Sequence, residues 1–133
     1  MNRFKERKTA FEIIFSFPFN KEKNVEEILD TYCTSNNELV ITDYIRNTVF
    51  GVYDNLDEID EKIKKNIKHR SFERLDNICL AALRLAIFEA LYNNDIPQAV
   101  AVNEAIELVK QYDDSLTAFV HGNLSLILEF KNE

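Results

Sequence analysis

The chain has 133 residues and 46% of them are hydrophobic, so we predict one domain, residues 1–133, with a sizeable buried core. Two glycines, two prolines and the lack of a recurring polar–apolar alternation favour an all-α fold, and so few glycines exclude a glycine-rich phosphate-binding loop. The formal net charge of −7 argues against indiscriminate nucleic-acid binding, although basic residues cluster in Arg3–Lys8 and Lys62–Arg74.

The amino-terminal segment combines a basic start with an apolar stripe. The run Arg3–Lys8 carries four cations against one carboxylate, and Pro18 is expected to end the helix. Phe11, Ile14 and Phe15 recur at helical spacing, which predicts that the later turns pack on the core while the basic first turns extend into solvent. Cations at a helix amino terminus oppose its dipole, so an anion bound there would explain the cluster. A solvated, frayed terminus is the alternative.

Two amphipathic helices are expected next. The first lies within Asn20–Glu38, with Asn24 as its cap, and the second within Leu39–Tyr53, with Thr42 as its cap. Gly51 near the end of the second helix either allows a close helix crossing or marks the stop.

A fourth helix is predicted over Asn55–Arg70. Its first half is acidic and its second half basic, an order that complements the helix dipole and needs no ligand. The alternative is that its lysines belong to a basic surface that binds a ligand.

The segment Ile78–Tyr92 is apolar on nearly every side of a helix, so other helices should surround it. Ser71 is a candidate cap for this central helix. Arg84 lies among its leucines and must be paired or reach the surface, because an isolated buried charge is very costly. Glu104 and Glu107 on the following helix are the expected partners, and a structural role for Arg84 is favoured over partner contact.

Two further helices complete the chain, giving about seven. Asp95 can cap the sixth, and Pro97 suits its first turn. The last helix follows Tyr112–Ser115 and contains Gly122, which costs about 1 kcal/mol relative to alanine in a helix interior. We therefore expect another helix or a ligand to approach closely at Gly122.

Blocks in the second half of the chain resemble a known family. Leu83–Glu89 reads LRLAIFE, Ile96–Pro97 follows, Val100–Lys110 reads VAVNEAIELVK, and Phe119–Gly122 reads FVHG. These blocks and their spacing resemble the NusB family of bacterial transcription antitermination factors. The resemblance implies an all-α fold of about seven helices in two packed sub-bundles.

The same resemblance implies a function. NusB proteins bind the boxA segment of nascent RNA together with NusE, a ribosomal protein of the small subunit. The pair docks on RNA polymerase and favours readthrough of terminators, notably in ribosomal RNA operons. Carried over residue by residue, the resemblance implies RNA contacts at Arg3, Lys5, Arg7, Lys8, Asp114, Ser115 and Phe119, and partner contacts at Phe15, Arg84 and Glu89.

This sequence departs from the family pattern in a few places. Phe4 interrupts the basic motif, and His121 replaces the usual asparagine. Because the loop before the last helix is about a residue short, either Asp114 or Ser115 could fill the polar RNA-contact position. Phe15 stands where the family has a tyrosine that faces NusE, so a hydrogen bond from that hydroxyl is lost.

Residues that could support catalysis or metal binding are scarce. Cys33 and Cys79 form no CxxC pair, and together with His69 and His121 they show no metal-ligand spacing. We therefore expect no enzyme activity, no metal and no cofactor. With no signal peptide and no membrane-spanning run, the expectation is a reduced cytosolic protein. Two other roles stay open: an accessory module for an rRNA-modifying enzyme, and a homodimeric rather than monomeric interaction module.

Overall fold

A computed structural model describes residues 2–36, 39–67 and 71–128 of the chain. Within these ranges the chain forms helices and no strand, which confirms the predicted all-α class. The α-helices are α1 Arg3–Phe15, α2 Val25–Ser35, α3 Asp43–Asp54, α4 Leu56–Asn66, α5 Asn77–Leu91, α6 Gln98–Tyr112 and α7 Thr117–Ile127; the short 3-10 turns are η1 Phe17–Phe19, η2 Phe72–Arg74 and η3 Asp114–Leu116.

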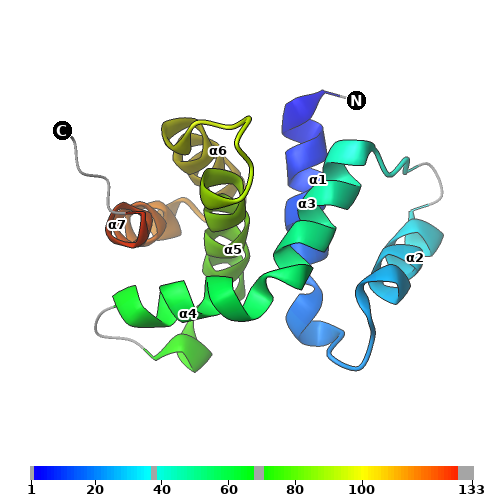
Figure 1. Cartoon of the computed structure of the whole chain (residues 1–133), viewed down its shortest axis with the longest axis horizontal. Helices are drawn as coiled ribbons and strands as arrows, with labels where there is room; N and C mark the ends of the chain where they lie inside the picture. The colour runs from blue at the N-terminus through cyan, green and yellow to red at the C-terminus, as the bar shows by residue number, and fades with distance from the viewer. Residues whose placement is uncertain (1, 37–38, 68–70, 129–133) are drawn as a thin grey trace.

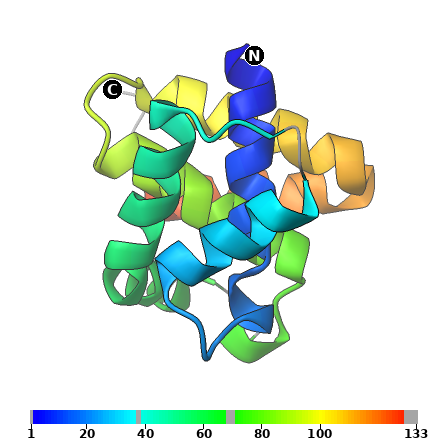
Figure 2. The same cartoon turned by 90° about the vertical axis from the view of Figure 1, so that its right-hand side faces the viewer.

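The helices form two groups that meet at α5. Helices α1, α2 and α3 make one group, α4 to α7 make the other, and both α1 and α3 pack directly on α5 (Figure 1). Helix α2 covers the outer side of the first group (Figure 2). Every residue from 79 to 87 is buried, so the prediction that helices surround this segment is confirmed. The thiol-bearing Cys79 is only 1% exposed.

Side-chain caps fix where the early helices begin. Asn24 accepts a hydrogen bond from the Glu27 backbone N–H at 2.9 Å, and the Glu27 carboxylate accepts one from the Asn24 backbone N–H at 2.9 Å. The Thr42 hydroxyl oxygen accepts from the Ile45 backbone N–H at 3.3 Å. Both predicted caps are therefore confirmed, and Asn2 caps α1 in the same way.

Two other predicted caps are wrong. The central helix begins after Asp76, whose carboxylate accepts from the Ile78 backbone N–H at 2.8 Å. Ser71 instead precedes η2, because a 3-10 turn lies between it and the helix. Helix α6 begins after Pro97, and Asp95 lies two residues too early to cap it.

The two glycines have different surroundings. A Cβ atom added to Gly51 would collide with the Phe88 ring, so the predicted close approach of α3 to another helix is confirmed. At Gly122 no neighbouring element of the described chain lies within 4 Å of the place a Cβ would take, so the expected close approach of another helix is wrong, while the approach of a ligand stays a prediction. Nothing in the structure explains a glycine at position 122.

The fourth helix is shorter than predicted. It ends at Asn66, and residues 68–70 of the predicted range lie outside the part that the structure describes. In the described part of the chain, no helix has the length and apolar character needed to cross a membrane.

Candidate nucleic-acid interface

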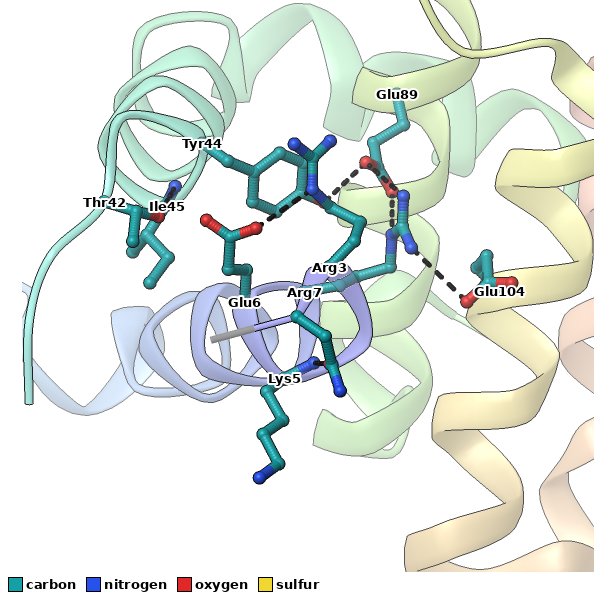
Figure 3. A network of polar contacts seen from close by, with 10 residues as sticks. Arg3, Lys5, Glu6, Arg7, Thr42, Tyr44, Ile45, Glu89 and Glu104 are labelled. Carbon is teal, nitrogen blue, oxygen red and sulfur yellow. Dashed lines mark hydrogen bonds and ion pairs between the residues drawn. The ribbon is translucent and has the colours of Figure 1, made fainter.

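The first turn of α1 presents cations at the surface. The Arg3 guanidinium lies 4.2 Å from the centroid of the Tyr44 ring, and its Nε donates to Glu6 Oε1 at 3.1 Å (Figure 3). The Arg3 side chain is still 57% exposed. Lys5 is exposed and points away from this cluster. A hydrogen bond from Thr42 lowers the pKa of Glu6 against the effect of burial, and Arg3 lowers it further, so the carboxylate stays charged.

Arg7 turns inward, in contrast to the expectation that the basic first turns extend into solvent. Its side chain is 5% exposed, and its Nε and Nη2 donate to the two carboxylate oxygens of Glu89 at 2.9 and 3.2 Å. Its Nη1 donates to Glu104 Oε1 at 3.3 Å. Burial alone would lower the pKa of Arg7, but the Glu89 and Glu104 carboxylates and the Tyr44 hydroxyl raise it. The guanidinium is therefore a permanent internal cation.

This ion-pair network joins four helices at one point. Arg7 comes from α1, Tyr44 from α3, Glu89 from α5 and Glu104 from α6 (Figure 3). The Tyr44 hydroxyl donates to Glu89 Oε2 at 2.5 Å, and burial together with the Glu89 charge raises the pKa of Tyr44. Because the Tyr44 ring lies under Arg3, the buried network also orients an exposed cation.

Lys8 lies on a different side of α1, beside the end of α6. Its Nζ is 5.7 Å from the centroid of the Tyr112 ring, which also packs against Phe11 at 5.2 Å. The Tyr112 hydroxyl donates to Glu12 Oε2 at 2.9 Å, and burial and this carboxylate raise the pKa of Tyr112. Tyr112 thus fixes the end of α6 against the basic helix.

The second predicted RNA-contact element starts directly after this tyrosine. Asp114 and Ser115 are exposed, and the Ser115 hydroxyl donates to Asp113 Oδ1 at 2.6 Å. Phe119 is half-buried and packs against the core. Tyr112, which immediately precedes this segment, lies against α1, so the segment follows directly on a residue that contacts the basic helix.

Phe15, the predicted partner-contact residue, lies at the other end of α1. Its half-buried ring packs against Phe19 at a centroid distance of 5.7 Å. Phe19 is 62% exposed, so much of its ring is open to solvent. The two rings together form an apolar projection, in which only Phe15 was a predicted partner contact.

Arg84 is paired, but not with the residues expected. Its Nε and Nη2 donate to the two oxygens of Asp60 on α4 at 2.9 and 2.8 Å. Glu104 contacts Arg7 instead, and Glu107 pairs with Lys110 at 3.5 Å. Arg84 is 6% exposed and Glu89 is 1% exposed, so both side chains serve internal contacts.

The lysines of α4, which form the first part of the second basic cluster, lie away from α1, while Lys68 and Arg70 are outside the described residues. The later turns of α4 are at the far side of the molecule from the amino terminus (Figure 1). Lys64 there lies 5.1 Å from the centroid of the Phe72 ring. These lysines therefore do not extend the surface formed by Arg3, Lys5 and Lys8.

Comparison with known proteins decides the family. A model of the NusB family matches residues 5–128. The chain belongs to the NusB family. This membership agrees with the fold, in which a basic first helix packs against a central apolar helix.

Relatives of similar length carry the same family name. Transcription antitermination protein NusB of Clostridium botulinum (strain Alaska E43 / Type E3) is 40% identical over 134 residues, which cover 97% of this chain and 99% of that protein. The protein of that name from Clostridium novyi (strain NT) is 40% identical over 136 residues and is covered equally.

Solved NusB structures share the fold. T. maritima NusB superposes with a TM-score of 0.84 at 30% identity, covering 98% of this chain and 92% of that one. A crystal structure of antitermination factors NusB and NusE in complex with dsRNA matches with a TM-score of 0.81 at 26% identity, covering 97% and 98% of the two chains.

Sequence reasoning on this NusB-family chain missed Tyr44 and the internal role of Arg7. One signal was available, because Glu89 is an isolated carboxylate in an apolar helix and needs a partner for the same reason as Arg84. Tyr44 carried no comparable signal.

Proposed function

We propose that this chain is a transcription antitermination factor that binds boxA single-stranded RNA together with NusE in the cytoplasm. The complex would promote readthrough by RNA polymerase, notably in ribosomal RNA operons. The observation that carries the proposal is the match to the NusB family over residues 5–128, with full-length relatives named transcription antitermination proteins. A similar structure contains NusB, NusE and dsRNA together, which supports RNA and NusE as the partners.

Three cations of α1 that stay outside the core are the proposed RNA contacts. Arg3, Lys5 and Lys8 would bind phosphates, while Asp114, Ser115 and Phe119 would contact the strand beside Lys8. Buried Arg7 would act as a positioning residue through Glu89 and Tyr44.

The NusE surface is proposed at the end of α1. Phe15 and exposed Phe19 offer an aromatic pair, and aromatic side chains are enriched at the cores of protein–protein interfaces. Arg84 and Glu89 would stabilise the fold through their buried ion pairs rather than touch the partner.

A gel-shift titration with a boxA-like RNA, using the chain alone and with its cognate NusE, tests the proposal. Lys5→Ala and Lys8→Ala should weaken binding and reduce the salt slope by roughly 0.7 log units for each lost phosphate contact. Lys65→Ala is the matched control, because Lys65 is an exposed lysine on the distant part of α4. A duplex of the same sequence tests the preference for a single strand. No shift with either protein sample, or equal effects of all three variants, would refute the assignment.

A further inference from the structure

A cavity opens beside the basic end of α1. It has a volume of about 640 Å³ and lies between the start of α1, one side of α3 and the turn that joins α5 to α6. We call it the turn pocket; its lining includes Arg3, Tyr44, Asn47, Phe88, Tyr92 and Asn94. Its volume falls in the range of sites that hold small organic molecules.

One wall of the turn pocket is aromatic. The rings of Phe88 and Tyr92 are nearly parallel, with centroids 5.9 Å apart and an interplanar angle of 8°. The Tyr92 hydroxyl donates to Glu58, which fixes its ring from the far side. Gly51 lets the edge of the Phe88 ring approach α3 closely, because any side chain at that position would displace it. Flat, fixed rings of this kind are the surfaces on which unpaired bases stack.

Two side-chain amides and a cation complete the lining of the turn pocket. The side-chain amides of Asn47 and Asn94 are exposed and have no hydrogen-bond partner among the residues that the structure describes. Each amide offers a donor and an acceptor, as the Watson–Crick edge of a base requires. Arg3 at the rim supplies a cation for a phosphate, while Asp95, also in the lining, would keep the phosphate backbone on the Arg3 side.

From this combination we propose that the turn pocket takes one unstacked nucleobase of a single-stranded RNA whose neighbouring phosphate lies on Arg3. The base would stack on the Phe88 and Tyr92 wall and donate to or accept from Asn47 and Asn94. This inference rests on the proposed RNA-binding function and adds a single-nucleotide contact to it.

Base-by-base fluorescence tests the turn pocket. A boxA-like RNA is prepared with 2-aminopurine at one position at a time, and each version is titrated with the full chain in the presence of NusE. A base that stacks in the pocket should give a strong fluorescence change at one position only. Asn47→Ala and Asn94→Ala should each weaken binding about three- to tenfold, the effect of one lost hydrogen bond, and should abolish the position-specific signal.

Two further variants separate pocket geometry from folding. Gly51→Ala should displace the Phe88 ring and reduce the same signal while the chain stays folded by circular dichroism, because alanine is the better helix former. Ser35→Ala, an exposed polar position on α2, should bind like the wild type.

The outcomes distinguish the turn pocket proposal from the proposed RNA-binding function on which it rests. If the wild type binds RNA but every position responds alike, or if the asparagine variants bind normally, the turn pocket proposal is overturned and the proposed function stands. If the wild type binds no RNA with or without NusE, both are overturned. If free adenosine or cytidine monophosphate binds as tightly as the RNA, the pocket is a nucleotide site and the strand-binding proposal is wrong.

Discussion

Removing the Glu89 charge should destabilise the fold strongly. In Glu89→Gln the amide keeps the shape of the side chain but leaves the buried Arg7 guanidinium with only Glu104, whose side chain is 33% exposed. Breaking a buried ion pair from one side costs about 3–5 kcal/mol, and the remaining Glu104 contact places the expected loss near the lower value. A loss of about 3 kcal/mol corresponds to a fall of about 10 °C in the melting temperature of a domain this size.

Urea unfolding followed by circular dichroism measures this loss. Glu26→Gln is the matched control, because its ion pair with Arg46 at 3.4 Å joins two exposed side chains, and such pairs contribute less than about 1 kcal/mol. The double variant Arg7→Met with Glu89→Leu should recover much of the stability, because no buried charge is left unpaired. The reasoning is refuted if Glu89→Gln lowers the free energy of unfolding no more than Glu26→Gln does. It is also refuted if the double variant loses as much stability as Arg7→Met and Glu89→Leu lose in sum as single variants.

Three other outcomes are expected. Arg84→Ala leaves the carboxylate of Asp60 without its two hydrogen bonds and should cost about 3 kcal/mol in urea unfolding; a loss below 1 kcal/mol would contradict the internal role of Arg84. The pKa of Glu6 is lowered from 4.5 in the folded chain, so the charged carboxylate stabilises the fold above that pH, and this stabilisation is lost on further acidification. Stability should therefore fall less steeply below pH 4.5 in Glu6→Gln than in the wild type. Phe19→Ala should weaken NusE binding about tenfold by calorimetry, with unchanged binding arguing against an interface beside Phe15.

Features set by neighbouring residues could be predicted from the sequence. Asn24 and Thr42 cap their helices through contacts only three residues along the chain, so their roles depend little on the rest of the fold. The apolar character of the central helix likewise required burial on all sides, whichever helices provided it. The family resemblance fixed the arrangement that these local signals leave open.

Features set by packing between helices could not be predicted. Arg84 needed a carboxylate, but α5 contacts five other helices, and their packing selected Asp60 rather than Glu104. Gly51 and Gly122 look equivalent as glycines in helices, and only the position of the Phe88 ring separates them. The inward turn of Arg7 depends on the same kind of choice, because its partners lie 82 and 97 residues away.

The inward turn of Arg7 has a consequence for how the proposed complex would assemble. With that guanidinium internal, the basic segment of α1 keeps three cations outside the core, and three phosphate contacts alone hold a strand weakly at physiological salt. A second protein that carries its own RNA contacts would raise the local concentration of the strand, so that the weak contacts of this chain would be enough to hold it. We therefore expect the chain to retain RNA only where the RNA strand and the partner protein are present together.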